Sequence, residues 1–333
     1  MKKKAFITLG LVATMLFATG CGMDCKMVIN DDYTSSMTET IYYNEQEIQD
    51  IVDMSGDDAT MEEATADMTP VEINGKKYYG STETNDNVSA ADTKYEFVQL
   101  NQNNAVIQVG DPQTAKELNE MGIEFINYEI MFPQNVVKTN CTLAEDGKTV
   151  LLNKDDISKN VTLYAIFNEN AANSKTVTYT GVTKGKIYKI KKYITINSKN
   201  VIKKVYITRN GKKYTDKGFY TVNGKDYDNE YNKFAFVKDG KYVVKTTLVN
   251  GAVSTMNFTV DRTKPTTNMK AKTYKTSKGK KITFKDATSG VSKATLNGKK
   301  IKSGKLVKKA GKYTLVIFDK AGNKTTVKFT IKK

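Results

Sequence analysis

Histidine and tryptophan are absent from this chain of 333 residues, and only four prolines and three cysteines occur in it. Without histidine the chain lacks the commonest general base at neutral pH, and a Ser-His-Asp triad is excluded. Zinc prefers four nitrogen or sulfur ligands, which three cysteines without histidine do not supply. Nucleophile elbows, phosphate loops and dinucleotide fingerprints are missing too. We therefore expect a protein that is not an enzyme, with no catalytic residues, no metal and no cofactor.

A glycoside hydrolase is the enzyme class that this composition leaves open, because it needs only two carboxylates that face one sugar. Neighbouring residues of a chain seldom face a common substrate, and the acidic pairs here lie in runs that are typical of solvated loops. The pairs are Asp57-Asp58, Glu62-Glu63 and Asp155-Asp156. An envelope glycoside hydrolase is therefore a remote alternative.

The first twenty residues have the pattern of a secretory signal. Three lysines precede AFITLGLVATMLFATG, an uncharged and mostly apolar run of about sixteen residues, which is shorter than the roughly 20 that a spanning helix needs. Small residues then lead directly to Cys21. This stretch resembles a bacterial lipoprotein signal, which implies cleavage before Cys21 and its acylation, for example with palmitate. The alternative is an ordinary secretory signal that ends near a cysteine by chance.

An acyl anchor at Cys21 would place the protein on the extracellular face of the membrane of a Gram-positive bacterium. Two acyl chains hold a protein firmly, since each buried methylene contributes about 0.8 kcal/mol. We expect residues 1–20 to be the signal peptide and residues 21–25 to be the acylated tether. For Cys25 and Cys141 two alternatives stay open, a disulfide bond or two free thiols.

The charge divides the chain into two parts. Residues 22–174 contain nine lysines and 28 acidic residues, for a net charge of −19. Residues 175–333 contain 40 basic and eight acidic residues, for a net charge of +32, and Arg209 and Arg262 are the chain's arginines. The sign changes at NENAANSK, a polar stretch that predicts a linker over residues 169–175. Opposite charges favour separate domains.

The acidic part, residues 26–168, is predicted to be α+β, with tyrosine, threonine and valine favouring strands. KMVINDDYTSSMTETIYYN and VEINGKKYYGSTET are typical of hairpins. NEQEIQDIVDM has helical spacing with Asn44 as its cap, and DPQTAKELNEMG predicts a second helix. Three strands are expected in IEFINYEIMFPQNVVKTNCTLAEDGKTVLL, the last two joined at Asp146-Gly147, and VTLYAIF closes the domain.

This order of elements resembles the LppM-type domain of bacterial lipoproteins. The resemblance depends on the strand pattern directly after the lipidated cysteine, on Phe132-Pro133 through Val150, and on LYAIF. Cys141 falls where glycine is expected. The resemblance implies an envelope-tethered, β-rich domain that contains a pocket for a lipid or glycolipid.

The basic part contains an internal repeat, in residues 176–262 and 263–333. Both copies run in the order strand, NGKK turn, GKY strand, turn, strand, and the first carries an insertion, TDKGFYTVNGKDYDNEYNK. The NGKK turns at Asn210 and Asn297 and the pair Asn250-Gly251 are at hairpin positions. Short strands with turns every 8–12 residues indicate small β-sandwiches.

The junction DRTKPT and the stretches VSKATLNGKKI and KAGKYTLVIFDKAGNKTTVKFTI resemble bacterial immunoglobulin-like modules of cell-surface proteins. The turn from Asp319 to Asn323 is the most specific part of this resemblance. It implies spacer and adhesion roles and no catalytic residues. The predicted fold class is therefore multidomain and mainly β, with an LppM-like α+β domain followed by two immunoglobulin-like β-sandwich modules.

The last module has 21 lysines and two acidic residues, for a net charge of +19. This charge is typical of contact with an anionic wall polymer, although a solvated lysine surface explains it as well. Nucleic acid is not expected, because the chain carries an export signal. Calcium at the joint between the modules is not expected either, since this half has few carboxylates. The lysines proposed for polyanion contact are Lys299, Lys300, Lys302, Lys305, Lys308 and Lys309.

We expect a non-enzymatic surface lipoprotein that displays its modules for cell-wall or surface interaction. The alternative is a lipid-binding or glycolipid-binding protein with an apolar pocket in residues 24–168, because methionine lines adaptable apolar surfaces. Ordinary core packing explains the methionines equally. They are Met23, Met27, Met37, Met54, Met61, Met68, Met121 and Met131.

Overall fold

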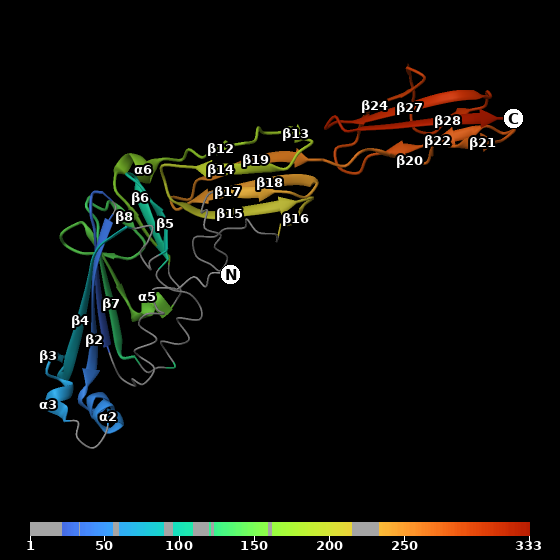
Figure 1. Cartoon of the computed structure of the whole chain (residues 1–333). Helices are drawn as coiled ribbons and strands as arrows, with labels where there is room; N and C mark the ends of the chain where they lie inside the picture. The colour runs from blue at the N-terminus through green and yellow to red at the C-terminus, as the bar shows by residue number, and fades with distance from the viewer. Residues whose placement is uncertain are drawn as a thin grey trace.

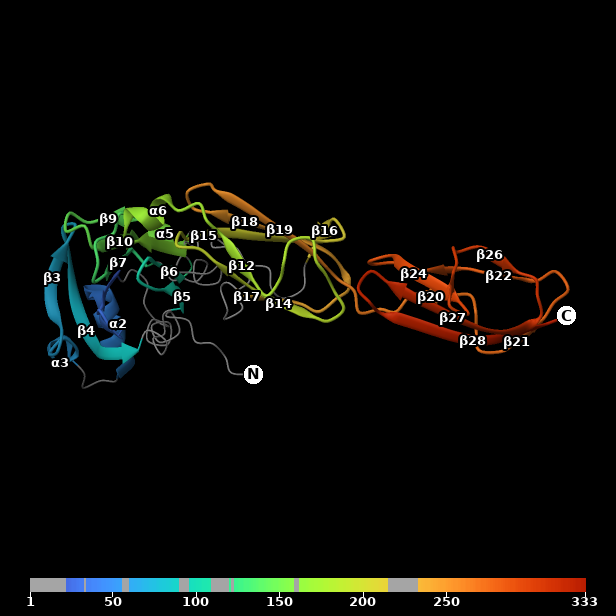
Figure 2. The same cartoon turned by 90° about the horizontal axis from the view of Figure 1, so that it is seen from above.

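The computed structural model of the chain describes residues 22–32, 34–55, 60–89, 96–108, 120, 123–158, 162–214 and 233–333. They form an α+β unit up to residue 173, here the first domain, and two β-sandwiches, the first module (residues 178–260) and the second module (residues 266–333). The three units follow one another, and the C-terminus lies at the far end of the second module (Figures 1 and 2). The predicted mainly β fold class is confirmed.

The first domain contains a seven-stranded sheet. Its strands are β1 (Gly22–Ile29), β2 (Thr34–Asn44), β3 (Thr69–Ile73), β4 (Lys76–Ser89), β7 (Phe125–Met131), β9 (Thr142–Leu143) and β10 (Thr149–Asn153). Their order across the sheet is β3-β4-β2-β1-β7-β10-β9. The two predicted hairpins are present, as β1–β2 and β3–β4. Because β1 begins at Gly22, residues 22–25 belong to this sheet and not to a tether.

A four-stranded sheet packs against one face of the first. Its strands are β5 (Glu96–Leu100), β6 (Asn104–Gln108), β8 (Lys138–Thr139) and β11 (Thr162–Ile166), in the order β5-β6-β11-β8. Side chains alternate along β1, so Met23, Cys25 and Met27 enter the core between the sheets, where they join Ala105 and Leu163. The region predicted as three strands thus forms four, because Lys138–Thr139 pairs with β11 in the second sheet.

The described helices of the first domain include α2 (Glu45–Ser55), α3 (Met61–Ala64) and α5 (Lys154–Ser158). The predicted cap of α2 is confirmed, since Asn44 Oδ1 accepts from the Glu47 amide at 2.9 Å and the Glu47 carboxylate accepts from the Asn44 amide at 2.8 Å. This reciprocal pair satisfies two amides that the first turn of the helix leaves free. Ile48 and Val52 form the buried apolar face of α2.

The stretch predicted as a linker, residues 169–175, is instead largely the helix α6 (Glu169–Asn173). The Asn168 side chain caps it by accepting from the Ala171 amide at 2.8 Å. Ala171 and Ala172 are buried in an apolar cluster that contains residues of the first module, such as Ile196 and Val201. The segment is polar overall, which predicted a linker, but its two small alanine side chains pack between the first domain and the first module.

The first module is a sandwich of a three-stranded and a five-stranded sheet. The strands are β12 (Thr178–Thr180), β14 (Lys192–Asn197) and β17 (Lys233–Phe236), then β13 (Ile187–Tyr188), β15 (Ile202–Arg209), β16 (Lys212–Lys213), β18 (Gly240–Leu248) and β19 (Val253–Val260). The five-stranded sheet has the order β13-β19-β18-β15-β16. Its core is aromatic, because Phe236 contacts Tyr242 and Phe258 with ring centroids 4.8 and 4.9 Å apart.

The second module repeats the five-stranded sheet of the first. Its strands are β20 (Thr266–Thr267), β21 (Thr273–Lys275), β22 (Lys280–Ile282), β23 (Phe284–Lys285), β24 (Val291–Leu296), β25 (Lys299–Lys300), β26 (Lys305–Val307), β27 (Gly311–Asp319) and β28 (Lys324–Lys332). The order β21-β28-β27-β24-β25 matches that of the first module strand for strand, including the parallel pair of the first strand with the last. Two short two-stranded sheets, β20–β23 and β22–β26, complete it.

The turns explain why the repeat was readable in the sequence. Asn210-Gly211 and Asn297-Gly298 have positive φ at both residues, which is the conformation of the tight hairpin turn predicted for NGKK. At Asn250-Gly251 the hairpin is present, but positive φ is found at Gly251 alone. The Asn250 side chain donates to the Ala172 and Ser174 carbonyls, at 3.2 and 2.9 Å, and so ties this turn to the end of the first domain.

Some predictions concern residues outside the described part of the chain. They are the signal peptide and Cys21, the helix over DPQTAKELNEMG apart from Glu120, the pair Asp57-Asp58, and most of the insertion of the first module. Among the helices of the described residues, none has the length and apolar composition that crossing a membrane requires.

Candidate functional site

A groove of about 580 Å³ lies on the seven-stranded sheet, over β2, β1, β7 and β10. Residues that alternate with the core residues of these strands supply most of its side chains, because successive residues of a strand point to opposite faces. Asp24 and Lys26 of β1 lie beside Thr40 and Thr38 of β2, and beside Asn127 and Glu129 of β7. The strand register therefore places acids, an amine, hydroxyls and an amide on one curved surface.

Asp24 holds the side chains in the groove in place. Its Oδ2 atom accepts from the Tyr42 hydroxyl at 2.9 Å, and its Oδ1 atom accepts from Asn127 Nδ2 at 2.8 Å. Burial of the phenol and the neighbouring Asp24 carboxylate raise the pKa of Tyr42 to about 12. Tyr42 is therefore a fixed hydrogen-bond donor at all physiological pH values.

An aromatic cluster lies at the end of the sheet where β1 begins. Phe125 contacts Tyr42 and Tyr78, with ring centroids 5.6 and 5.8 Å apart. The Phe125 ring packs directly on Gly22, so that a Cβ atom at position 22 would lie only 2.0 Å from the ring. Glycine is thus required directly after Cys21 for this contact to form.

The groove does not have the lining that the methionine hypothesis predicted. Met23, Met27 and Met37 are buried in the core on the other face of the sheet, and Met54 is exposed on α2. Leu151 and the Tyr42 ring are the main apolar groups that the groove offers from its own face. Acyl chains need an apolar lining, so this groove suits polar ligands better than lipid tails.

Cys25 and Cys141 are not joined by a disulfide bond in this structure. Cys25 is buried within β1, and burial raises the pKa of the Cys141 thiol to about 12. A thiol with such a pKa stays protonated and is a weak nucleophile at neutral pH. The disulfide alternative is therefore not the one that the structure shows, and Cys141 packs against the core instead.

The predicted acidic pairs serve as helix caps where the structure describes them. The Glu63 carboxylate accepts from the Thr60 amide at 3.1 Å, and the Asp156 carboxylate accepts from the Asn153 amide at 3.1 Å. Their structural role is sufficient to explain these carboxylates. Asp156 also lies at the edge of the groove.

All six lysines proposed for polyanion contact are exposed. Two of them form the edge strand β25 of the five-stranded sheet, and one belongs to β26, which pairs with β22 in a different sheet. The remaining three lie in the segments before and after β26. In sequence order, the six lysines are Lys299, Lys300, Lys302, Lys305, Lys308 and Lys309. The structure therefore distributes the run of lysines over two sheets of one module.

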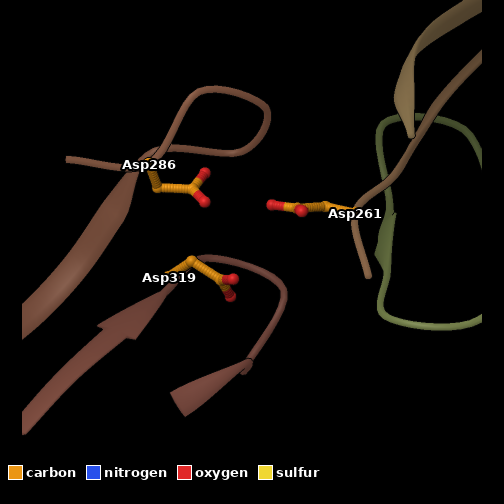
Figure 3. A group of neighbouring side chains, drawn as sticks. All are labelled: Asp261, Asp286 and Asp319. Carbon is orange, nitrogen blue, oxygen red and sulfur yellow. The ribbon is translucent and has the colours of Figure 1, made fainter. Parts of the chain in front are cut away.

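A carboxylate cluster lies at the junction of the two modules, where the sequence suggested none. Asp261 follows β19 of the first module, Asp286 follows β23, and Asp319 ends β27 of the second module. One carboxylate oxygen of each lies within 4.8 Å of those of the other two, and the three side chains point toward one another (Figure 3). Asp261 and Asp319 are 0% and 2% exposed.

Backbone amides hold each carboxylate of this cluster. Asp261 Oδ2 accepts from the Ser289 amide at 3.1 Å, Asp286 Oδ1 accepts from the Gly290 amide at 2.7 Å, and Asp319 Oδ1 accepts from the Asn323 amide at 2.8 Å. The contact from Ser289 to Asp261 joins the two modules. Carboxylate oxygens are also suitable ligands for a hard divalent cation, although such ions prefer six or more oxygen ligands and this cluster offers three.

The cluster makes the junction sensitive to pH. Burial, with added repulsion from Asp286 and Asp319, raises the pKa of Asp261. The folded state therefore holds a proton there more tightly than the unfolded chain does, and this contribution to stability is lost as the pH rises from about 4 through the folded pKa. For Asp261→Asn we expect the unfolding temperature to depend less steeply on pH between pH 4 and 7 than it does in the wild type.

Asp239, at the same junction, provides the matched control. Burial by itself would raise the pKa of Asp239. Hydrogen bonds from Thr263 and Arg262 to its carboxylate outweigh this effect and hold the pKa below its usual value. Asp239→Asn should therefore lose stability mainly above the usual aspartate pKa. The pH dependence that Asp239 contributes is thus opposite in sign to that of Asp261. Calorimetry with EDTA, repeated with calcium chloride, measures both, since a bound cation would suppress the pH dependence of the wild type. Identical slopes for Asp261→Asn and the wild type in EDTA would contradict the prediction.

No protein-family model matches the chain, and no curated protein is similar to it. Among solved structures it is similar to the folded domain of LppM from Mycobacterium tuberculosis, with 13% identity over 46% of this chain and 94% of that chain, and a TM-score of 0.27. It is also similar to the insect immune protein hemolin, with 12% identity over 79% of this chain and 61% of that one, and a TM-score of 0.26. Murine CEACAM1b gives 11% identity, 47% and 99% coverage, and a TM-score of 0.23. At these identities and scores, the likenesses carry no argument about function.

Proposed function

We propose that this protein is a non-enzymatic surface lipoprotein, anchored through acylated Cys21, that displays two basic β-sandwich modules toward anionic polymers of the cell wall. The charge layout supports the proposal most directly. The acidic residues belong mainly to the first domain, and the 40 basic residues after position 174 belong to the modules. A protein anchored at its acidic end would present its basic end away from the anchor.

The start of the fold supports a short anchor. β1 begins at Gly22, the residue after Cys21, and Met23 is already 3% exposed in the core. An acylated Cys21 would therefore hold the first domain directly at the membrane surface, with no flexible spacer. The end of the sheet at which β1 and β7 begin, with Gly22 and Phe125, would face the lipid headgroups.

Detergent phase partition tests the anchor in a bacterial host that acylates lipoproteins. We expect the wild type in the detergent phase, labelled by an alkyne analogue of palmitate, and Cys21→Ser in the aqueous phase without label. Cys141→Ser is the matched control, because it removes a thiol that no acylation signal precedes, and it should partition like the wild type. Wild-type protein in the aqueous phase would refute the anchor.

Lipid or glycolipid binding is a second candidate function, and the groove on the first domain is the observation that favours it. Its polar lining shifts the expected ligand from acyl chains toward the sugar part of such a molecule. A hydrolase function would need two carboxylates that are free to act on one bond. In the groove, Asp24 is engaged by Tyr42 and Asn127, and Asp156 caps α5, so binding is better supported than cleavage.

A further inference from the structure

We propose that the groove on the seven-stranded sheet binds a neutral or amine-bearing saccharide. This inference does not depend on the acyl anchor or on the basic modules. The volume of the groove, about 580 Å³, falls in the range of small-molecule sites. The floor is made of four neighbouring strands, whose backbone groups pair with one another, so the side chains provide the recognition.

The side chains of the groove match a ligand that is rich in hydroxyl groups. A sugar hydroxyl donates one hydrogen bond and accepts others, and therefore needs acceptors and donors side by side. Register places the Glu129 acceptor beside the Lys26 donor, and Lys26 beside the Thr38 hydroxyl, which can do both. The Tyr42 ring and Leu151 add the apolar surface that the C–H face of a sugar ring contacts.

Several side chains of the groove are already held by hydrogen bonds, which lowers the entropy cost of binding a ligand. Asp24 fixes Tyr42 and Asn127 at 2.9 and 2.8 Å, and Thr40 bonds to Thr82 on β4 at 2.9 Å. Side chains that are already held lose little conformational entropy when a ligand arrives. A flat, disordered polar surface would lack this advantage.

Charge decides between classes of saccharide. Asp24, Glu129 and Asp156 outnumber Lys26 at the groove, and the first domain as a whole is strongly acidic. This field repels phosphorylated or carboxylated polymers and favours neutral or cationic ligands. The groove and the second module therefore attract ligands of different charge.

A printed glycan array, probed with the full mature chain carrying Cys21→Ser, tests the proposal. We expect binding to neutral or amine-bearing oligosaccharides, and competition by the same free oligosaccharide in solution, which shows that the sugar itself is bound and not its lipid or linker. Absence of binding across the array, or binding to anionic glycans alone, would overturn the inference.

Two glutamates of the same sheet form a matched pair of variants. Glu129→Gln in the groove should weaken the affinity for the best array saccharide about tenfold or more, because a hydrogen bond to a charged acceptor is lost. Glu72→Gln changes an exposed glutamate of β3, away from the groove, and should leave the affinity unchanged. Lys26→Gln is a second groove variant and should also weaken binding. Equal effects of Glu129→Gln and Glu72→Gln would contradict the placement of the site.

Discussion

Replacing Ile166 by alanine is expected to lower the unfolding temperature of the first domain and of the first module together. Ile166 ends β11 of the first domain, yet its side chain is 0% exposed within the cluster that contains Ile196 and Val201 of the first module. Truncating a buried isoleucine to alanine typically costs about 2–5 kcal/mol, from lost burial and from the cavity left behind. Both units line this cavity, so both should lose stability.

Ile317→Ala in the second module is the matched control. Ile317 is also 0% exposed, but it belongs to a separate core formed by residues of the second module. Its loss should lower the transition of the second module alone. Scanning calorimetry of the mature chain, with hydrogen exchange to assign each transition, measures both variants. If Ile166→Ala left the first module unchanged, the two units would be thermodynamically independent.

Hydrogen bonds reinforce the shared core between the first domain and the first module. Asn104 Nδ2 donates to the Lys199 carbonyl at 2.8 Å, and Asn200 Nδ2 donates to the Ala172 carbonyl at 2.6 Å. Asn250 contacts the same carbonyl from another turn. These contacts hold the first module in one orientation, so an anchor on the first domain would also orient the module.

Replacing the six lysines from Lys299 to Lys309 by glutamine is expected to weaken binding to poly(glycerol phosphate) by about 100-fold at low ionic strength. Exposed ion pairs contribute about 0.5 kcal/mol each, and six of them give about 3 kcal/mol. Binding of this kind releases counterions from the polymer, so the affinity of the wild type should fall steeply with salt and that of the variant less steeply. Titration calorimetry at several salt concentrations measures both effects.

A second set of six lysines provides the control for net charge. Each is an exposed lysine of the first module, so its replacement by glutamine removes the same charge from a different place. The set is Lys184, Lys189, Lys199, Lys203, Lys212 and Lys213. We expect a clearly smaller loss of affinity. Equal losses from the two sets would show that total charge, and not the second module, attracts the polymer.

Local signals in the sequence predicted the elements of the fold well. The NGKK stretches have the positive φ values of the expected turns, and Asn44 caps α2 through the expected contact. In the closing hairpin, apolar residues alternate along the sequence, and Leu315 and Ile317 accordingly face the core with Phe329. These signals depend on residues a few positions apart, so the sequence alone contains them.

The linker, the tether and the disulfide show where local signals are insufficient. NENAANSK is polar, but its two alanines fill a space that another domain creates. Residues 22–25 follow the segment predicted to be a signal sequence, but their side chains alternate as part of β1. The strand β7, about a hundred residues further along the chain, pairs with them. Whether Cys25 meets Cys141 depends on the packing of two sheets.

The sequence by itself determined the two charged halves, the repeated modules and the hairpins, because composition and short-range spacing encode them. Tertiary structure alone decided the groove around Asp24, the core shared through Ile166, and the meeting of Asp261, Asp286 and Asp319. Each of these is made by strands that are distant in the chain and become neighbours through sheet register and packing. Register and packing depend on the whole fold, which no short stretch of sequence specifies.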